Sequence, residues 1–284
     1  MGTRAVQTPR SSPAAIWSLK NLDDMNVPTL AELSAKGESP EILFWVGCAG
    51  SFDDRYKRVT KAFVKILNAL EIKFGVLGTE ESCTGDPARR AGNEFLFQMQ
   101  AMSNIQVLNG YGVKRIVTAC PHCFNTLKNE YPELGGNYEV IHHATFLQQL
   151  INEGKIKLKD GHAFKGKKIT FHDSCYLGRA NNIYEAPREV LEALDVDLVE
   201  MKRCRTTGLC CGAGGAQMFK DAEKGKKEIN TDRTEEALAT GATTIAVACP
   251  FCMTMITDGV KTKERETDVN VKDLAELIAE ANGL

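Results

Sequence analysis

The chain has 284 residues, of which 43% are hydrophobic and 25% are charged, a composition typical of a globular protein with one or two folded domains. Its 35 lysines and arginines nearly balance its 37 aspartates and glutamates, and the net charge of −2 gives no basic field for binding nucleic acid. No apolar run approaches the length of a membrane span and no secretory leader is visible, so we expect a cytoplasmic protein without direct membrane insertion.

Strand and helix patterns alternate along the chain. Residues 1–40 form an N-terminal extension in which, after a disordered start, a capping-box pattern at Thr29 and Glu32 predicts one short helix over 29–36. In the first half the predicted strands are 42–46, 72–77, 114–118 and 138–141, and the predicted helices are 56–70, 95–108, 121–130 and 144–152. In the second half the predicted strands are 168–172, 197–199, 243–247 and 268–271, and the predicted helices are 187–194, 222–239, 250–258 and 272–281. The alternation predicts an α/β fold of two tandem, pseudo-symmetric Rossmann-like βα repeats with parallel sheets.

Ten cysteines are the most unusual feature of the composition. Nine of them fall into two groups with matching spacing: Cys48, Cys83, Cys120 and Cys123 in the first half, and Cys175, Cys210, Cys211, Cys249 and Cys252 in the second. In each group 35 residues separate the first two positions, and each group ends in Cys-Pro-x-Cys. The chain is therefore an internal duplication, with a first cysteine-rich domain at 41–153 and a second at 167–284, joined by a linker. Cys204 has no counterpart, and we expect it to be inert.

The cysteines of each group are expected to meet at one edge of their sheet. Cys48, Cys83 and Cys120 each follow a predicted strand, and parallel strands end at the same edge. Cys123 lies one helical turn after Cys120, at the start of a helix whose free N–H groups favour a thiolate. In a reducing compartment, cysteines that converge in this way are more typical of metal or redox sites than of disulfides.

Thiolate ligands select soft metal centres, and a set of four or five sulfurs indicates an iron–sulfur cluster or zinc. Zinc usually has two short ligand pairs, whereas each half of this chain has one Cys-x-x-Cys and distant single positions. Five cysteines also exceed what tetrahedral zinc needs. The residues therefore favour an iron–sulfur cluster in the second half, with zinc and a purely structural cysteine cluster as the alternatives.

The second half contains one extended pattern: Cys175, then Cys210-Cys211-Gly212, then Cys249-Pro250-Phe251-Cys252. It resembles the duplicated cysteine-rich CCG domain of the B-type and D-type subunits of heterodisulfide reductase, and the likeness covers about residues 40–282. The resemblance implies an iron–sulfur oxidoreductase subunit that carries out two-electron redox chemistry on a disulfide or a similar substrate. It further implies that these five cysteines hold a [4Fe–4S] cluster, which is noncubane in well-studied relatives.

The first half departs from the family pattern at Thr84, which stands where the second cysteine of the adjacent pair is expected. Cys48, Cys83, Cys120 and Cys123 then offer four thiolates. Three outcomes remain open for this half: a four-cysteine [4Fe–4S] cluster, a cluster that recruits Asp86 or a histidine, and a zinc site.

A separate electron-transfer partner is expected, because the chain has no ferredoxin cysteine run and no flavin or nicotinamide fingerprint. The family analogy implies a ferredoxin-like or flavoprotein subunit, or a quinone-linked complex that would hold the chain at the inner face of the membrane. Two other function classes compete with this interpretation. One is a metal-free thiol–disulfide oxidoreductase that uses Cys120-Pro121-His122-Cys123, and the other is a zinc-stabilised scaffold subunit.

Several residues near the cysteines have both a functional and a structural interpretation. The glycines of Gly212-Ala213-Gly214-Gly215 are expected to let backbone N–H groups approach a cluster rather than bind a nucleotide. His142 and His143 are expected to be structural, and so is His172, whose functional alternatives are a donor to the cluster or a proton relay. Charge compensation of a cluster and simple surface ion pairing are equally open for three arginines: Arg89, Arg90 and Arg179.

Overall fold

The computed structural model describes residues 25–158, 161–221 and 225–284. The disordered start predicted at the N-terminus falls largely on residues 1–24, outside the described residues. Among the described residues, no helix combines the length and the hydropathy needed to cross a bilayer.

Two four-stranded parallel sheets form the centre of the two repeats. The first has the order β2-β1-β3-β4 and consists of β1 (Ile42–Trp45), β2 (Phe74–Gly75), β3 (Arg115–Thr118) and β4 (Glu139–His142). The second has the order β6-β5-β7-β8 and consists of β5 (Lys168–Phe171), β6 (Asp197–Leu198), β7 (Thr244–Val247) and β8 (Asn270–Asp273). Because the two orders are the same, the predicted pair of pseudo-symmetric βα repeats is confirmed.

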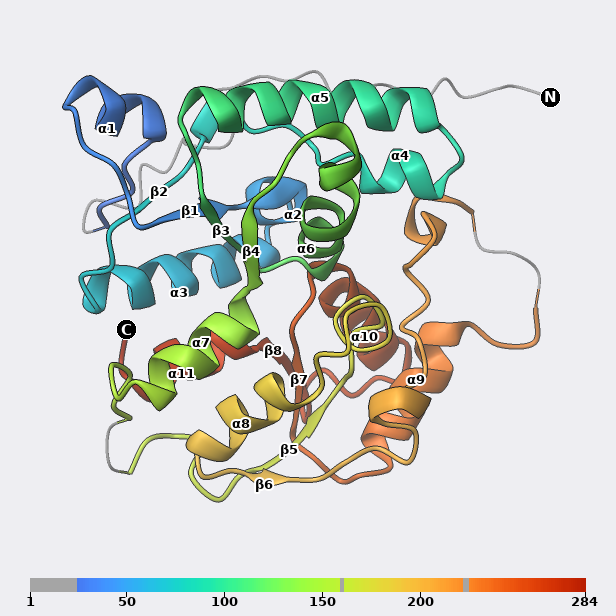
Figure 1. Cartoon of the computed structure of the whole chain (residues 1–284). Helices are drawn as coiled ribbons and strands as arrows, with labels where there is room; N and C mark the ends of the chain where they lie inside the picture. The colour runs from blue at the N-terminus through green and yellow to red at the C-terminus, as the bar shows by residue number, and fades with distance from the viewer. Residues whose placement is uncertain (1–24, 159–160, 222–224) are drawn as a thin grey trace.

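Helices connect and cover the strands (Figure 1). The first repeat has α1 (Leu30–Ala35), α2 (Gly47–Phe52), α3 (Tyr56–Ala69), α4 (Asp86–Arg90), α5 (Glu94–Gly110), α6 (Pro121–Asn125) and α7 (His143–Asn152). The second repeat has α8 (Glu185–Ala193), α9 (Ile229–Leu238), α10 (Pro250–Thr262) and α11 (Leu274–Ala281). Short 3₁₀ or π turns lie at η2 (Gly78–Glu80), η3 (Thr126–Glu130), η4 (Tyr131–Leu134), η5 (Arg205–Thr207) and η6 (Gln217–Phe219).

Local sequence explains where several helices begin. Thr29 caps α1 in a full capping box, since its hydroxyl accepts the N–H of Glu32 at 3.2 Å and the Glu32 carboxylate accepts the N–H of Thr29 at 2.9 Å. Asp273 and Glu276 form the same box at the start of α11. Pro121 and Pro250 begin α6 and α10, where a missing N–H costs nothing.

Some predicted boundaries are wrong. The helix expected over 222–239 begins only at Ile229, and residues 225–228 are not helical. In that stretch Lys227 turns back to pair with Asp232 and Glu235, and Gly225 is a poor helix former. The strand expected over 72–77 pairs with β1 only at Phe74–Gly75 and has one further bridge, from Val76 to Thr29. Helices α2 and α4 were not expected.

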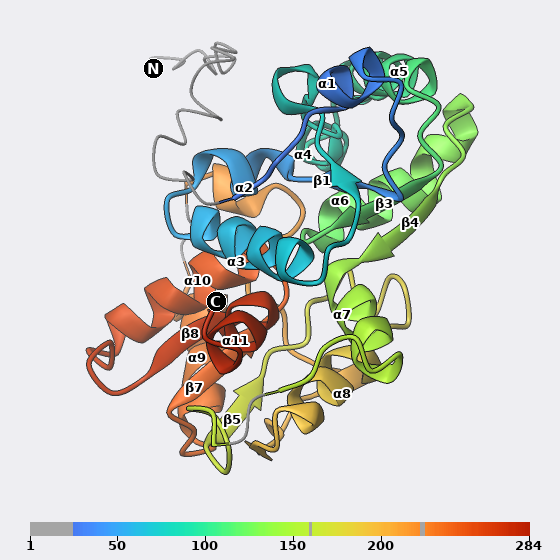
Figure 2. The same cartoon turned by 90° about the vertical axis from the view of Figure 1, so that its left-hand side faces the viewer.

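The two repeats share one hydrophobic core. Helix α3 of the first repeat packs on α11 of the second, and α7 packs on α8. Figure 2 shows α3 lying against α11 between the two sheets. Buried side chains run without a break from Leu43 in β1 through Phe63 in α3 to Leu277 in α11. The repeats are therefore packed together as one body.

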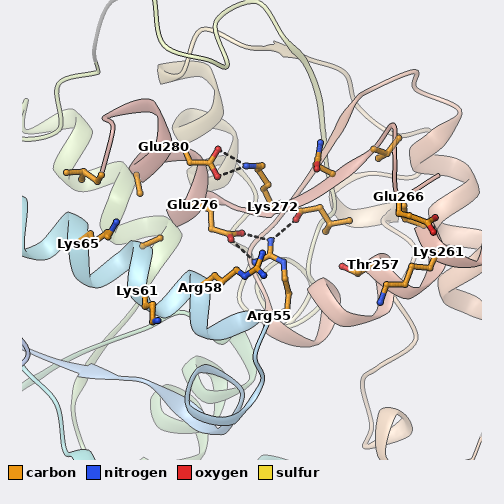
Figure 3. A pocket seen from close by; sticks show the side chains of 17 residues that line it. Arg55, Arg58, Lys61, Lys65, Thr257, Lys261, Glu266, Lys272, Glu276 and Glu280 are labelled. Atoms are coloured by element: carbon orange, nitrogen blue, oxygen red, sulfur yellow. Dashed lines mark hydrogen bonds and ion pairs between the residues drawn. The ribbon is translucent and has the colours of Figure 1, made fainter. Parts of the chain in front are cut away.

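A polar network crosses the same junction. Arg55 donates two hydrogen bonds to the carboxylate of Glu276, at 2.6 and 2.7 Å, and a third to the carbonyl of Val271 at 2.8 Å (Figure 3). Deeper inside, Asp273 accepts from His143 Nε2 at 2.8 Å, and both side chains of this pair are buried. These contacts fix the second repeat on α3 in one orientation.

We predict that Arg55→Gln lowers the free energy of unfolding by about 1–3 kcal/mol, because it removes charge-assisted hydrogen bonds to the buried Glu276 carboxylate. Arg58→Gln is the matched control, with an expected change within about 0.5 kcal/mol, since Arg58 lines the same groove but has no ion pair within the described residues. Urea unfolding of both variants measures the difference. Equal losses for the two variants would contradict the assigned role of Arg55.

Candidate metal sites

The four cysteines of the first repeat line one small pocket. Cys48 lies in α2, Cys83 in the loop before α4, and Cys120 and Cys123 at the start of α6. The thiols of Cys48 and Cys83 are in hydrogen-bond contact, and so are those of Cys120 and Cys123. The two loops are held together by Glu81, whose carboxylate accepts the N–H groups of Val46 at 3.0 Å and Gly47 at 2.6 Å.

The five cysteines of the second repeat form an unbroken chain of thiol contacts. The order of contact is Cys175, Cys210, Cys211, Cys252 and Cys249. Cys175 follows β5, and Cys249 and Cys252 begin α10 after β7. The structure thus brings together all nine cysteines that the spacing had grouped, at the carboxyl edges of the two sheets. Four line the first pocket, and the cluster of five is called the second pocket by analogy. Cys204 belongs to neither group, because the charged groups that influence its thiol are arginines and carboxylates rather than other cysteines.

Backbone N–H groups point at sulfur in the same way in both repeats. The N–H of Gly85 donates to Cys83 Sγ at 3.5 Å, and the N–H of Gly212 donates to Cys210 Sγ at 3.3 Å. Both glycines have positive φ, +89° and +93°, which a residue with a side chain rarely adopts. Gly212 therefore supplies a backbone donor of the kind that the sequence suggested, and Gly85 supplies a matching one that was not expected from the sequence.

Thr84 takes the place of Cys211 in the first pocket. Its buried hydroxyl donates to Cys123 Sγ at 3.8 Å, just as the thiol of Cys211 contacts Cys252. Asp86, the other oxygen donor of this pocket, is already bound by Arg90 at 3.1 Å and by His122 at 3.0 Å. The first pocket therefore presents four sulfurs and a hydroxyl, whereas the second presents five sulfurs.

The contacts between thiols promote ionisation at some of the sulfurs. Hydrogen bonding from Cys48 lowers the pKa of Cys83 to about 7, although burial opposes the shift. Burial raises the pKa of Cys249, but hydrogen bonds from Cys252 and His122 outweigh it and lower that pKa to about 5. The same contacts raise the pKa of the partner thiols, Cys48 and Cys252, and a metal that binds thiolates would have to displace those protons.

His122 lies between the two pockets, a position that the sequence did not reveal. Its ring stacks on Tyr176 at 4.1 Å and meets Phe251 edge-on at 4.8 Å, and both partners belong to the second repeat. Its Nδ1–H donates to Asp86, and the ring also hydrogen-bonds to the sulfur of Cys249. The only feature of the sequence that could have pointed to His122 is its place inside the Cys-Pro-x-Cys motif, where the second repeat has Phe251.

His172 lies against the second pocket. A ring nitrogen of this buried histidine and the sulfurs of Cys211 and Cys252 all lie within 4.8 Å of one another. Its Nδ1 accepts from Arg233 Nε at 2.9 Å. Burial, followed by the charge of Arg233, lowers the pKa of His172 to about 3, so the ring is neutral. Sequence reasoning had named His172 but not Arg233, which comes from α9.

A buried ion pair supports the loop that carries Cys175. Both side-chain oxygens of Asp173 accept from Arg188, at 2.9 and 3.0 Å, and one also accepts the N–H of Arg205 at 2.6 Å. Asp173 thereby ties the end of β5 to α8 and to the segment that leads to Cys210.

The other arginines and histidines named from the sequence make no hydrogen bond to a cysteine in the described structure. Arg89 and Arg90 pair with Glu130, and Arg179 is exposed. His142 is buried, and its Nε2–H donates to the carbonyl of Ala119 at 3.3 Å. His143 has the equally buried contact to Asp273 described above. These contacts favour the structural interpretation of both histidines.

The family model described as "Cysteine-rich domain" (CCG) matches residues 42–128 and 169–257, one match in each repeat. The chain belongs to the cysteine-rich domain family. Within this family, the resemblance of the cysteine pattern to heterodisulfide reductase is confirmed by a relative, the D-type subunit of the dihydromethanophenazine:CoB–CoM heterodisulfide reductase of Methanosarcina barkeri. It is 35% identical over 87% of this chain and 60% of its own length.

Two other relatives are more similar in sequence. The EtfAB:quinone oxidoreductase of Syntrophomonas wolfei is 46% identical over 92% of this chain and 37% of its own length. The probable iron-sulfur-binding oxidoreductase FadF of Bacillus subtilis is 47% identical over 91% of this chain and 36% of its own length. The chain thus spans little more than a third of each of these two proteins.

We predict that Gly85→Ala lowers the free energy of unfolding by about 2–4 kcal/mol, the sum of left-handed strain and a clash. A Cβ at Gly85 would lie 2.8 Å from the ring of Phe97 and 3.2 Å from its backbone. Gly92→Ala is the matched control, because Gly92 has a similar φ of +87° but open space around it. Its expected loss is about 1–2 kcal/mol from strain alone. Thermal unfolding that gave equal losses would refute the assigned packing of the Cys83 loop.

Proposed function

We propose that this chain is the iron–sulfur module of an electron-transfer oxidoreductase. Cys175, Cys210, Cys211, Cys249 and Cys252 would hold a [4Fe–4S] cluster in the second repeat, and the five-sulfur set favours the noncubane form. Such a cluster supplies one-electron storage and transfer when bound. The observation that carries the proposal is the unbroken chain of five thiol contacts at one sheet edge.

The surroundings of the second pocket fit an iron–sulfur centre. Its donors are soft sulfurs, and an N–H group already reaches one of them, from Gly212 to Cys210. Cys211, Cys249 and Cys252 are buried, whereas Cys175 and Cys210 are partly exposed. The chain's own residues would thus exclude water from one side of the cluster and leave the other side accessible to a substrate or a redox partner.

For the first repeat we propose a metal centre with four cysteine ligands. We favour a [4Fe–4S] cluster over zinc, held by Cys48, Cys83, Cys120 and Cys123. The hydroxyl of Thr84 donates to sulfur, which favours an auxiliary contact over a fifth ligand. Both oxygens of Asp86 are engaged by Arg90 and His122, which argues against its recruitment.

We further propose that electrons enter or leave through another module, either a ferredoxin-like or a flavoprotein partner. The relative named EtfAB:quinone oxidoreductase is 46% identical to this chain, against 35% for the heterodisulfide reductase relative. The difference favours a quinone-linked pathway over reduction of a disulfide. Such a pathway would place the chain on the cytoplasmic side of a membrane through its partner.

Iron analysis of the anaerobically purified protein tests the proposal. We expect a brown protein with about four iron and four sulfide per occupied site. Cys211→Ser should change the EPR signal of the second cluster, whereas Cys204→Ser, the matched control outside both pockets, should leave it unchanged.

Three results would contradict the proposal. A colourless protein whose thiols titrate as redox pairs would favour a metal-free dithiol enzyme that uses Cys120 and Cys123. Zinc alone in stoichiometric amount would favour a scaffold subunit. An unaltered EPR spectrum in Cys211→Ser would remove this residue from the ligand set.

A further inference from the structure

Among the buried polar atoms without a partner in the described residues, three belong to this region: Nε2 of His172, Oγ of Ser174 and Nη2 of Arg233. The Nε2 atom of His172 is buried and has no hydrogen-bond partner among the described residues. An unpaired polar nitrogen in the interior loses its hydration without compensation, so such an atom calls for an explanation. The nearby groups that could interact with it are the sulfurs of Cys211 and Cys252, within 4.8 Å of the ring.

Arg233 determines which ring nitrogen of His172 carries the proton. A guanidinium group only donates hydrogen bonds, and Arg233 Nε donates to His172 Nδ1 at 2.9 Å. The Nδ1 atom must therefore offer its lone pair, and in the neutral ring the hydrogen is on Nε2. The unpaired atom is thus an N–H donor, held beside two sulfurs.

The position of Arg233 is itself well fixed. Its side chain is buried, and Nη1 donates to the carbonyl of Arg203 at 2.7 Å and to Glu236 at 3.1 Å. Because three hydrogen bonds orient the guanidinium group, the ring of His172 has little freedom to turn.

We infer that His172 donates an Nε2–H···S hydrogen bond to the sulfur of the second site, at Cys211 or Cys252, and thereby raises the reduction potential of the cluster. Arg233 acts as the positioning residue that keeps the proton on Nε2. The inference rests on the proposed iron–sulfur function. Hydrogen bonds to cluster sulfur stabilise the more negative, reduced state, which is the physical basis of the expected effect.

The same three groups would also suit a metal ion with His172 as a ligand. The tautomer argues against this, because a nitrogen that binds a metal must offer a lone pair and Nε2 carries the hydrogen. Five cysteines moreover supply the ligands without it. His172 therefore tunes the site without ligating it.

The duplication offers an independent parallel. Trp45 precedes Cys48 by the same three residues that separate His172 from Cys175. Its indole N–H is likewise buried and without an acceptor among the described residues. Both repeats thus place a ring N–H at the end of their first strand, ahead of the first cysteine.

Redox titration followed by EPR tests the inference on the anaerobically purified holoprotein. At the midpoint potential of the wild type, His172→Leu should shift the oxidised-to-reduced ratio about tenfold toward the oxidised state, which is ~59 mV for a one-electron couple. His172→Gln should restore most of the shift, because its amide can accept from Arg233 and still donate. His162→Leu, a histidine in the segment between the repeats, is the matched control and should not change the ratio.

Labelling with ¹⁵N-histidine gives a second readout, in which the strength of the coupling in the wild type already distinguishes a ligand from a hydrogen-bond donor. A weak hyperfine coupling that is present in the reduced wild type and diminished in His172→Leu is expected for a hydrogen bond, and the coupling that remains is assigned to His122 on Cys249. A strong coupling would identify His172 as a ligand and overturn the inference, as would the absence of any coupling. If iron is present and the ratio does not move in His172→Leu, this inference alone fails. If the wild type contains no iron or sulfide, the proposed function itself fails.

Discussion

The arrangement of the whole protein depends on parallel strands that deliver cysteines to one edge of a sheet. In the first sheet β1 pairs with β3 and β3 with β4, in a register that aligns Trp45 with Thr118 and Thr118 with His142. Residues that are more than 30 positions apart in the chain thereby meet just beyond the strand ends. Gathering so many sulfurs has a cost, because like-charged thiolates repel each other. Groups other than sulfur must therefore fix the loops, and Glu81 in the first repeat and Asp173 in the second do so by binding backbone N–H groups.

The duplication preserves the scaffold while the residues around the sulfurs have diverged. Gly85 and Gly212 keep the same conformation and the same N–H···S contact. At three other matched positions the chemistry differs: Thr84 against Cys211, Trp45 against His172, and His122 against Phe251. Two of these exchanges, at Thr84 and His122, change a polar contact to sulfur without disturbing a strand or a helix. One fold thus holds two cysteine groups with matched spacing and different neighbours.

The sequence was sufficient for the features that depend on local pattern and on spacing. The strand positions, the capping box at Thr29 and the two cysteine groups follow from periodicity and from equal gaps. It was not sufficient for contacts between elements that only the tertiary fold brings together. Arg233 and His172 are separated by 61 positions, and Arg55 and Glu276 by 221, so no local signal marks them. The start of α9 was misplaced for a related reason, since the ion pairs of Lys227 depend on the turn that precedes the helix.

The shared core has a consequence for how the two pockets can work together. Repeats joined by a small polar interface would be expected to move relative to each other. Here the buried side chains are continuous from α3 to α11, and Arg55 and His143 add directional contacts across the junction. His122 of the first repeat moreover contacts both Tyr176 and Cys249 of the second. The distance between the two pockets is therefore set by close packing rather than by a hinge. The two cysteine groups therefore keep a fixed spacing without any rearrangement of the repeats.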